Sequence, residues 1–125
     1  MKHKILEVKS SDWSVFCKRI SKEQAGATVK VEVVGSNGVS DELSANGTFE
    51  SLAFDATGAC NNLIALRLSD GRPIAHEIID PVHIRLNQSE AGDCNQLEVK
   101  AENGITSITF HPAIRAEWLA GLKTA

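Results

Sequence analysis

The sequence predicts a mainly β protein: a small, strongly bent antiparallel sheet, or an SH3-like or Sm-like barrel of five to seven strands, with an amphipathic helix before it and a short helix after it. Three observations support this class. One early segment has helical periodicity, several later segments alternate apolar and polar residues, and Gly, Asn and Asp residues separate them. A chain of 125 residues is long enough for one hydrophobic core, so we expect a single domain over residues 1–125.

The N-terminal helix is expected at residues 11–24. Four apolar residues recur there with the spacing of one helix face, and they would pack on the sheet. They are Trp13, Phe16, Cys17 and Ile20. Asp12 and the two serines before it are N-cap candidates, because their side-chain oxygens can accept from the free N–H groups of a first helical turn. Gly26 is a suitable terminator.

The β body is expected at residues 28–110. Strands are predicted at 28–33, 49–54, 63–68, on both sides of Asp80 and Pro81, at 96–101 and at 105–110. A polar connection is expected from Gly35 to Gly47. The pair Asn103-Gly104 favours a tight hairpin between the last two strands, since both residues tolerate positive φ angles. Pro112 is expected to end the last strand, and a short C-terminal helix is predicted at 113–123 from the spacing of Ile114, Trp118 and Leu122.

The segment around Asp80-Pro81 holds two of the four histidines. Its alternation predicts one inward row before the break and another after it, and a proline there forces the strand to bend or step. The first row is Ile74, His76 and Ile78; the second is Val82, Ile84 and Leu86. His83 and Arg85 then point outward.

Two interpretations of this segment are open. In the first, His76 is a partly buried neutral imidazole that hydrogen-bonds to backbone near the bend, as buried polar groups normally find a partner. In the second, His76, Asp80, His83 and Arg85 form a small polar pocket that binds a small molecule or a metal, since a histidine beside a carboxylate can titrate near neutral pH. The parity of His83 and Arg85 directs them outward, which argues against their meeting His76 in one pocket. His76-Glu77-x-x-Asp80 resembles a zinc-protease helix motif, but the strand periodicity and Pro81 contradict that context.

Three motifs in order resemble a family of small bacterial domains of unknown function. They are Asp12-Trp13-x-x-Phe16, then His76-x-Ile78-x-x-Pro81-x-His83-Ile84-Arg85-Leu86, then Leu97-Glu98-Val99 with Asn103-Gly104 and Phe110. The resemblance covers about residues 12–111. In the family the closing hairpin reads more like Asp-Gly-Thr-Thr, whereas this chain has Asn103-Gly104-Ile105-Thr106. The resemblance implies a compact β domain with an amphipathic first helix, and implies no activity, ligand or catalytic residue.

The composition and charge of the chain argue against several kinds of ligand and partner. The net charge is −3, Tyr is absent and aromatic residues make up 5%, which disfavours nucleic acid as a partner, including the uridine binding of Sm-like proteins. Cys17, Cys60 and Cys94 are odd in number and far apart, so we expect reduced thiols, no metal and no cofactor. A thiol at Cys60, in a predicted turn, is the most accessible candidate for reactivity.

The N-terminal residues lack the apolar run of a signal peptide, and no apolar stretch is long enough to span a membrane, so we expect a cytoplasmic protein. No nucleophile elbow, phosphate-binding loop or dinucleotide fingerprint is present, so we expect no enzymatic activity. Leu63, Ile79, Ile105 and Trp118 have outward parity or lie on a terminal helix, where an apolar patch could form. The leading hypothesis is therefore association with another protein or with a second copy of this chain.

Overall fold

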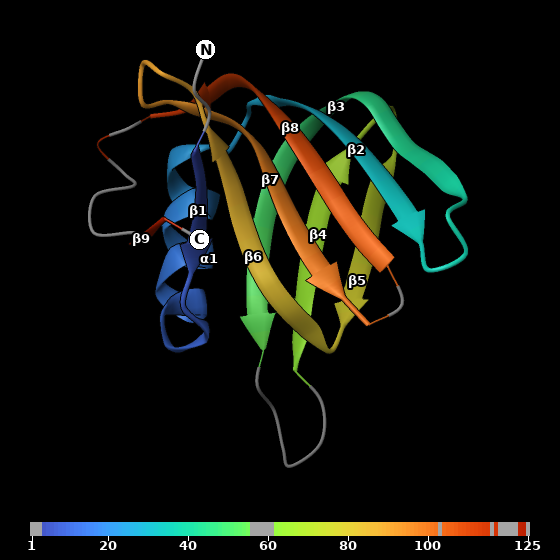
Figure 1. Ribbon diagram of the computed structural model, residues 1–125. Helices are drawn as coiled ribbons and strands as arrows, with labels where there is room; N and C mark the ends of the chain where they lie inside the picture. The colour runs from blue at the N-terminus through green and yellow to red at the C-terminus, as the bar shows by residue number, and fades with distance from the viewer. Residues whose placement is uncertain (1–3, 56–61, 103, 116, 118–122, 125) are drawn as a thin grey trace.

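Nine strands form one antiparallel sheet in the computed structural model, which describes residues 4–55, 62–102, 104–115, 117 and 123–124 (Figure 1). Their order across the sheet is β5-β4-β3-β2-β8-β7-β6-β1-β9. The strands are β1 (Lys4–Val8), β2 (Thr28–Gly35), β3 (Ser40–Asp55), β4 (Leu63–Ser69), β5 (Pro73–Ile79), β6 (Pro81–Gln88), β7 (Cys94–Ala101), β8 (Gly104–Ile114) and β9 (Lys123–Thr124). A short 3-10 turn, η1 (Ser10–Asp12), leads into α1 (Trp13–Glu23). The mainly β class predicted from the sequence is confirmed.

The sheet folds over into two layers. Figure 1 shows β1, β6, β7, β8 and β2 in front, and β4, β5 and the second half of β3 behind. The long strand β3 connects the layers, because it pairs with β2 over its first half and with β4 over its second. The sheet does not close into a barrel, because its edge strands β5 and β9 do not pair with each other in the described chain.

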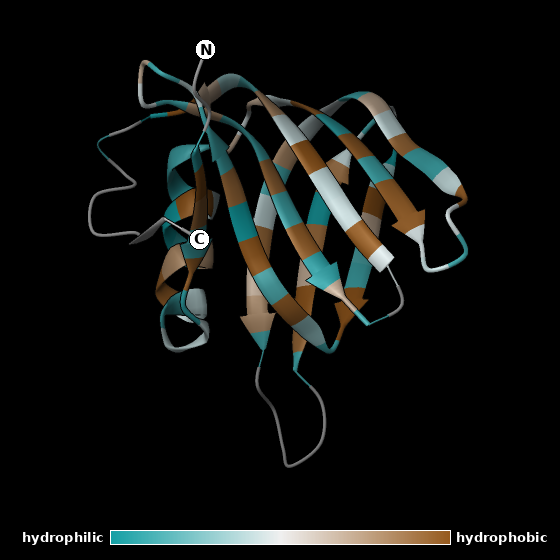
Figure 2. Cartoon of the chain, viewed as in Figure 1, coloured by the Kyte–Doolittle hydropathy of each residue, from teal (hydrophilic) through white to brown (hydrophobic). Residues whose placement is uncertain are grey.

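The hydrophobic core lies between the two layers and is covered on one side by α1. Figure 2 shows the alternation of hydrophilic and hydrophobic residues along β6, β7 and β8 that directs every second side chain inward. Phe49 of β3 and Phe110 of β8 meet edge to face across the layers, with ring centroids 5.0 Å apart. All four residues of the predicted helix stripe are buried, which confirms that face of α1.

The helix itself begins at Trp13 rather than at residue 11, because Ser10–Asp12 form the 3-10 turn. Asp12 occupies the N-cap but makes no side-chain capping bond, so its predicted capping role is wrong. Trp13 instead anchors the start of α1 from its side chain, donating from Nε1 to the carbonyl of Val8 at 2.9 Å. Its ring meets Phe54 of β3 edge to face at 5.4 Å.

Several strand boundaries differ from those predicted. The polar stretch expected as a connection from Gly35 to Gly47 belongs largely to β3, and β1 was not predicted. β8 continues through Pro112, after a cis His111–Pro112 bond, to Ile114, so the start predicted for a C-terminal helix is strand. Lys123, at the end of the predicted helix, belongs to β9. Trp118 and Leu122, the Asn103 turn position and Cys60 lie outside the described residues.

Among the described residues, no helix has both the length and the apolar character that crossing a membrane requires.

Candidate functional site

The β5–Asp80–β6 corner carries the residues singled out from the sequence. On β5, Ile74, His76 and Ile78 point inward as predicted, with Ile78 buried and the other two partly buried. Asp80 turns the chain with a positive φ of 53°, and its N–H donates to the carbonyl of Asn62 at 2.9 Å. A non-glycine residue in this conformation marks a sharply constrained corner.

The row predicted after the corner is wrong at Val82. Pro81 is buried and Val82 is 51% exposed, while Ile84 and Leu86 are buried as predicted. The pairing of β6 with β7 skips one residue between Pro81 and His83, so Val82 is the extra residue of a β-bulge. One inserted residue exchanges the inward and outward positions on one side of the bulge. A pattern of strict alternation therefore predicts the wrong face there.

His76 faces the space between the layers. Its Nε2 lies 3.2 Å from the Oγ1 of Thr106 on β8, in the opposite layer. The two side chains border a small cavity of about 100 Å³ that is also lined by Val33 and Ala101. Burial lowers the pKa of His76, because the charged imidazolium loses hydration there. His76 is thus a partly buried, hydrogen-bonded histidine as in the first interpretation, but its partner is the side chain of Thr106 and not the backbone near the bend.

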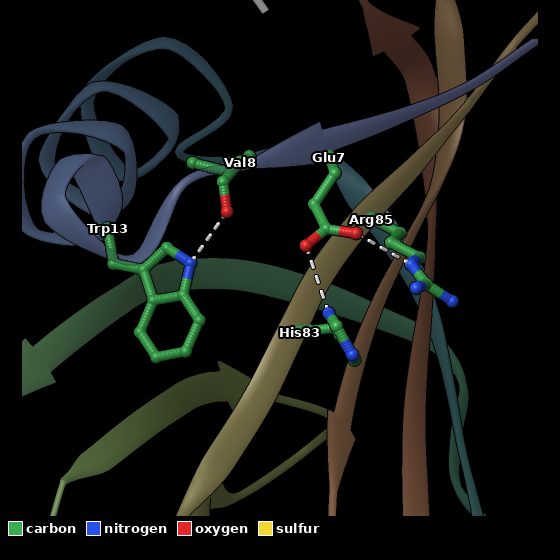
Figure 3. A network of polar contacts seen from close by, with 5 residues as sticks. All are labelled: Glu7, Val8, Trp13, His83 and Arg85. Atoms are coloured by element: carbon green, nitrogen blue, oxygen red, sulfur yellow. Dashed lines mark hydrogen bonds and ion pairs between the residues drawn. The ribbon is translucent and has the colours of Figure 1, made fainter. Parts of the chain in front are cut away.

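His83 and Arg85 lie on the outer face of the front layer, as their parity predicted. Figure 3 shows that both converge on Glu7 of β1: His83 Nδ1 is 3.0 Å from one carboxylate oxygen, and Arg85 Nε donates to the other at 3.1 Å. The hydrogen bond with His83, followed by that with Arg85, lowers the pKa of Glu7. Each side chain remains roughly one third exposed, so the arrangement ties β1 to β6 at the surface.

The structure therefore divides the predicted pocket into separate places. His76 bonds inward to Thr106, His83 and Arg85 bond outward to Glu7, and Asp80 bonds through its backbone to Asn62. Within the described chain, no group of three or more His, Cys, Asp or Glu residues could hold a metal ion. Glu7 is the partner that sequence reasoning missed, because it lies 76 residues from His83 and on an unpredicted strand.

The free edge of β5 is the remaining feature of this corner. In an antiparallel pair, residues that exchange hydrogen bonds alternate with residues whose N–H and C=O point away from the partner. Asp80 bonds to Asn62, one position beyond the last pair of the β4–β5 ladder. Ile79, and with it Glu77 and Ala75, therefore directs its backbone groups away from β4. Among the described strands, none pairs with β5 on that side.

The contact between α1 and β3 gives an independent check on this alternation. The Ser21 hydroxyl donates to the carbonyl of Leu52 and accepts from its N–H, both at 2.8 Å. Leu52 therefore does not exchange hydrogen bonds with Leu66, its partner on β4. Leu66 exchanges them instead with His76 on its other side, which again leaves the odd-numbered residues of β5 facing outward.

A family model matches residues 4–117, nearly the whole chain, and its description is a family of unknown function, DUF5335. The chain belongs to this family. The match agrees with the resemblance seen in the sequence, which covered about residues 12–111, and it extends that resemblance to include β1. No curated protein and no solved structure matches the chain.

Proposed function

We propose that this domain works without catalysis, by associating with a second copy of itself through the free edge of β5. The observation that carries the proposal is the row of outward backbone N–H and C=O groups at Ala75, Glu77 and Ile79, because an unpaired strand edge is a template for another strand. A second β5 running antiparallel would complete those hydrogen bonds and join the two sheets across a two-fold axis.

Exposed apolar side chains at the same corner support this proposal. Ile79 is 53% exposed and Val82 is 51% exposed, and they flank the Asp80-Pro81 turn within four residues. Leu63 lies opposite Ile79 on β4 and is partly buried on the same outer face. Large apolar side chains gathered beside an open edge would lose their contact with water when a second copy pairs there.

The charge on β5 selects the pairing register. Glu77 is exposed at the middle of the free edge, and a two-fold axis centred on it would place two carboxylates directly opposite each other, which is destabilising. An axis centred on Ile78 would set Ala75 opposite Pro81, which lies beyond the corner at Asp80. An axis centred on His76 instead sets Glu77 of each chain opposite Ala75 of the other, so that these two residues exchange their outward hydrogen bonds. We therefore assign that register to the dimer.

Two variants test the edge in different ways. Ala75→Pro removes an N–H that points away from β4, so the fold tolerates it as edge strands tolerate proline, while the intermolecular ladder loses a hydrogen bond and gains a ring. Ile79→Lys places a charge in the apolar corner. Val39→Lys is the matched control, because Val39 is 56% exposed on the β2–β3 turn, away from β5.

Native mass spectrometry and sedimentation at tens of micromolar measure the result, with circular dichroism to verify folding. We expect a dimer for the unaltered chain and for Val39→Lys, and a monomer for Ala75→Pro and Ile79→Lys. A monomeric unaltered chain would refute self-association. A dimer that survives both β5 substitutions would place the interface elsewhere.

A further inference from the structure

A groove of about 440 Å³ runs between α1 and the second half of β3, on the side of the back layer opposite to β5. Figure 1 shows α1 beside this part of β3, where β2 no longer accompanies it. Most of its surface is apolar, and its lining includes Cys17, Leu52, Ala53 and Phe54. The groove therefore combines an apolar lining with the part of β3 that pairs with β4 alone.

The backbone of β3 is directed into this groove. Leu52 points its N–H and C=O toward α1, where Ser21 bonds both. Phe54 is two residues further along the same strand, so its N–H and C=O point the same way. In the described chain, the only hydrogen bonds between α1 and β3 are the two that join Ser21 to Leu52. The backbone N–H and C=O of Phe54 therefore point into the groove without a bond to α1.

The charge of the groove is positive. Its charged lining residues are Lys18 and Lys22, one helical turn apart and both exposed, and neither forms an ion pair with a described residue. The strand side of the lining contributes Ser51, Ala53 and other uncharged residues. In a chain of net charge −3, this is a local reversal of sign.

We propose that this groove binds an extended acidic segment of another protein. The segment lies along β3 beyond Ser21 and exchanges backbone hydrogen bonds with Phe54, in the manner of an added strand. Its apolar side chains rest on Ala53 and Phe54, and alternate carboxylates face Lys18 and Lys22. The surface is separate from the β5 edge, so a dimer would present two such grooves.

A capped synthetic peptide that alternates Glu and Val is the probe, and the same peptide with Lys in place of Glu is its control. Backbone amide shifts in NMR titrations report the position of binding. We expect the acidic peptide to shift the amides of residues 52–54 and of the facing turn of α1, and to bind more weakly as salt is added. The basic peptide is expected to cause no shift there.

Charge reversal on the helix gives the second test. The double variant Lys18→Glu, Lys22→Glu turns two attractions into two repulsions, so the dissociation constant of the acidic peptide should rise by about tenfold or more. Lys30→Glu is the control, since Lys30 is a half-exposed lysine on β2 in the front layer. We expect it to leave the dissociation constant within about twofold, because Lys30 does not line the groove and salt weakens the interaction between exposed charges that are not in contact.

The outcomes separate this proposal from self-association. Equal binding of acidic and basic peptides, or an unchanged dissociation constant in the double variant, would refute the groove as an acidic-segment site. The absence of binding at millimolar peptide would refute it as well. Shifts confined to residues 75–79 would assign the peptide to the β5 edge and refute the groove. The double variant should dimerise as the unaltered chain does, because neither lysine lies on β5.

Discussion

Replacing Ser21 with Ala should destabilise the domain more than the same substitution at Ser14, the other serine of α1. The Ser21 hydroxyl satisfies both the N–H and the C=O of Leu52, at 2.8 Å each, where β3 has lost β2 as a neighbour. Alanine keeps the helix and removes both bonds together. The substitution therefore leaves two backbone groups of a strand without their protein partner.

The magnitude follows from the location of those groups. A polar group left without a partner costs about 1–3 kcal/mol, and the value depends on how far water can replace the lost bond. The groove beside Leu52 admits water, which places each group near the lower limit, for a total of about 2 kcal/mol. The higher helix propensity of alanine returns roughly 0.5 kcal/mol, so the expected loss is about 1.5 kcal/mol.

Urea unfolding followed by far-ultraviolet circular dichroism measures the loss, since a shift of midpoint at constant slope reports stability. Ser14→Ala is the matched control: it makes the same change on the same helix, at an exposed residue that forms no hydrogen bond with the described residues of β3. Ser21→Thr retains the hydroxyl and should recover most of the stability. If the free energies of unfolding of Ser21→Ala and Ser14→Ala differ by less than about 0.5 kcal/mol, the hydrogen bonds from Ser21 to Leu52 do not stabilise the fold.

Two further predictions concern titrating groups. Burial lowers the pKa of His76 in the folded state below its ordinary value of 6.5. Between the folded and unfolded pKa values the unfolded chain therefore binds more protons than the folded one. The contribution of His76 to the free energy of unfolding should be fully present above pH 6.5 and should decline as the pH falls below that value. His76→Gln should flatten that part of the stability profile, and an unchanged slope would mean that His76 does not cause it. Burial also raises the pKa of the Cys17 thiol to about 12 and of the Cys94 thiol to about 11. Peptide mapping after iodoacetamide at pH 8 should find both unmodified until the protein is unfolded, whereas rapid labelling of either in the native protein would contradict its burial.

The candidate site shows where local pattern stops being informative. Alternation placed His76 inward and His83 and Arg85 outward, because the side-chain period of a strand is a local property. It could not identify Thr106 or Glu7 as their partners, since both contacts join strands that are distant in sequence. It also failed at Val82, where the bulge inserts one residue into the register.

The sequence by itself determined the mainly β class, the buried face of α1 and the inward row of β5, because each depends on residue periodicity within one element. Tertiary structure alone decided that Lys4–Val8 and the polar first half of β3 are strands, since their backbone hydrogen bonds come from β6 and β2. It also decided that the sheet stays open. Whether the edge strands β5 and β9 meet depends on the path of the whole sheet around its core, and no local pattern encodes that path.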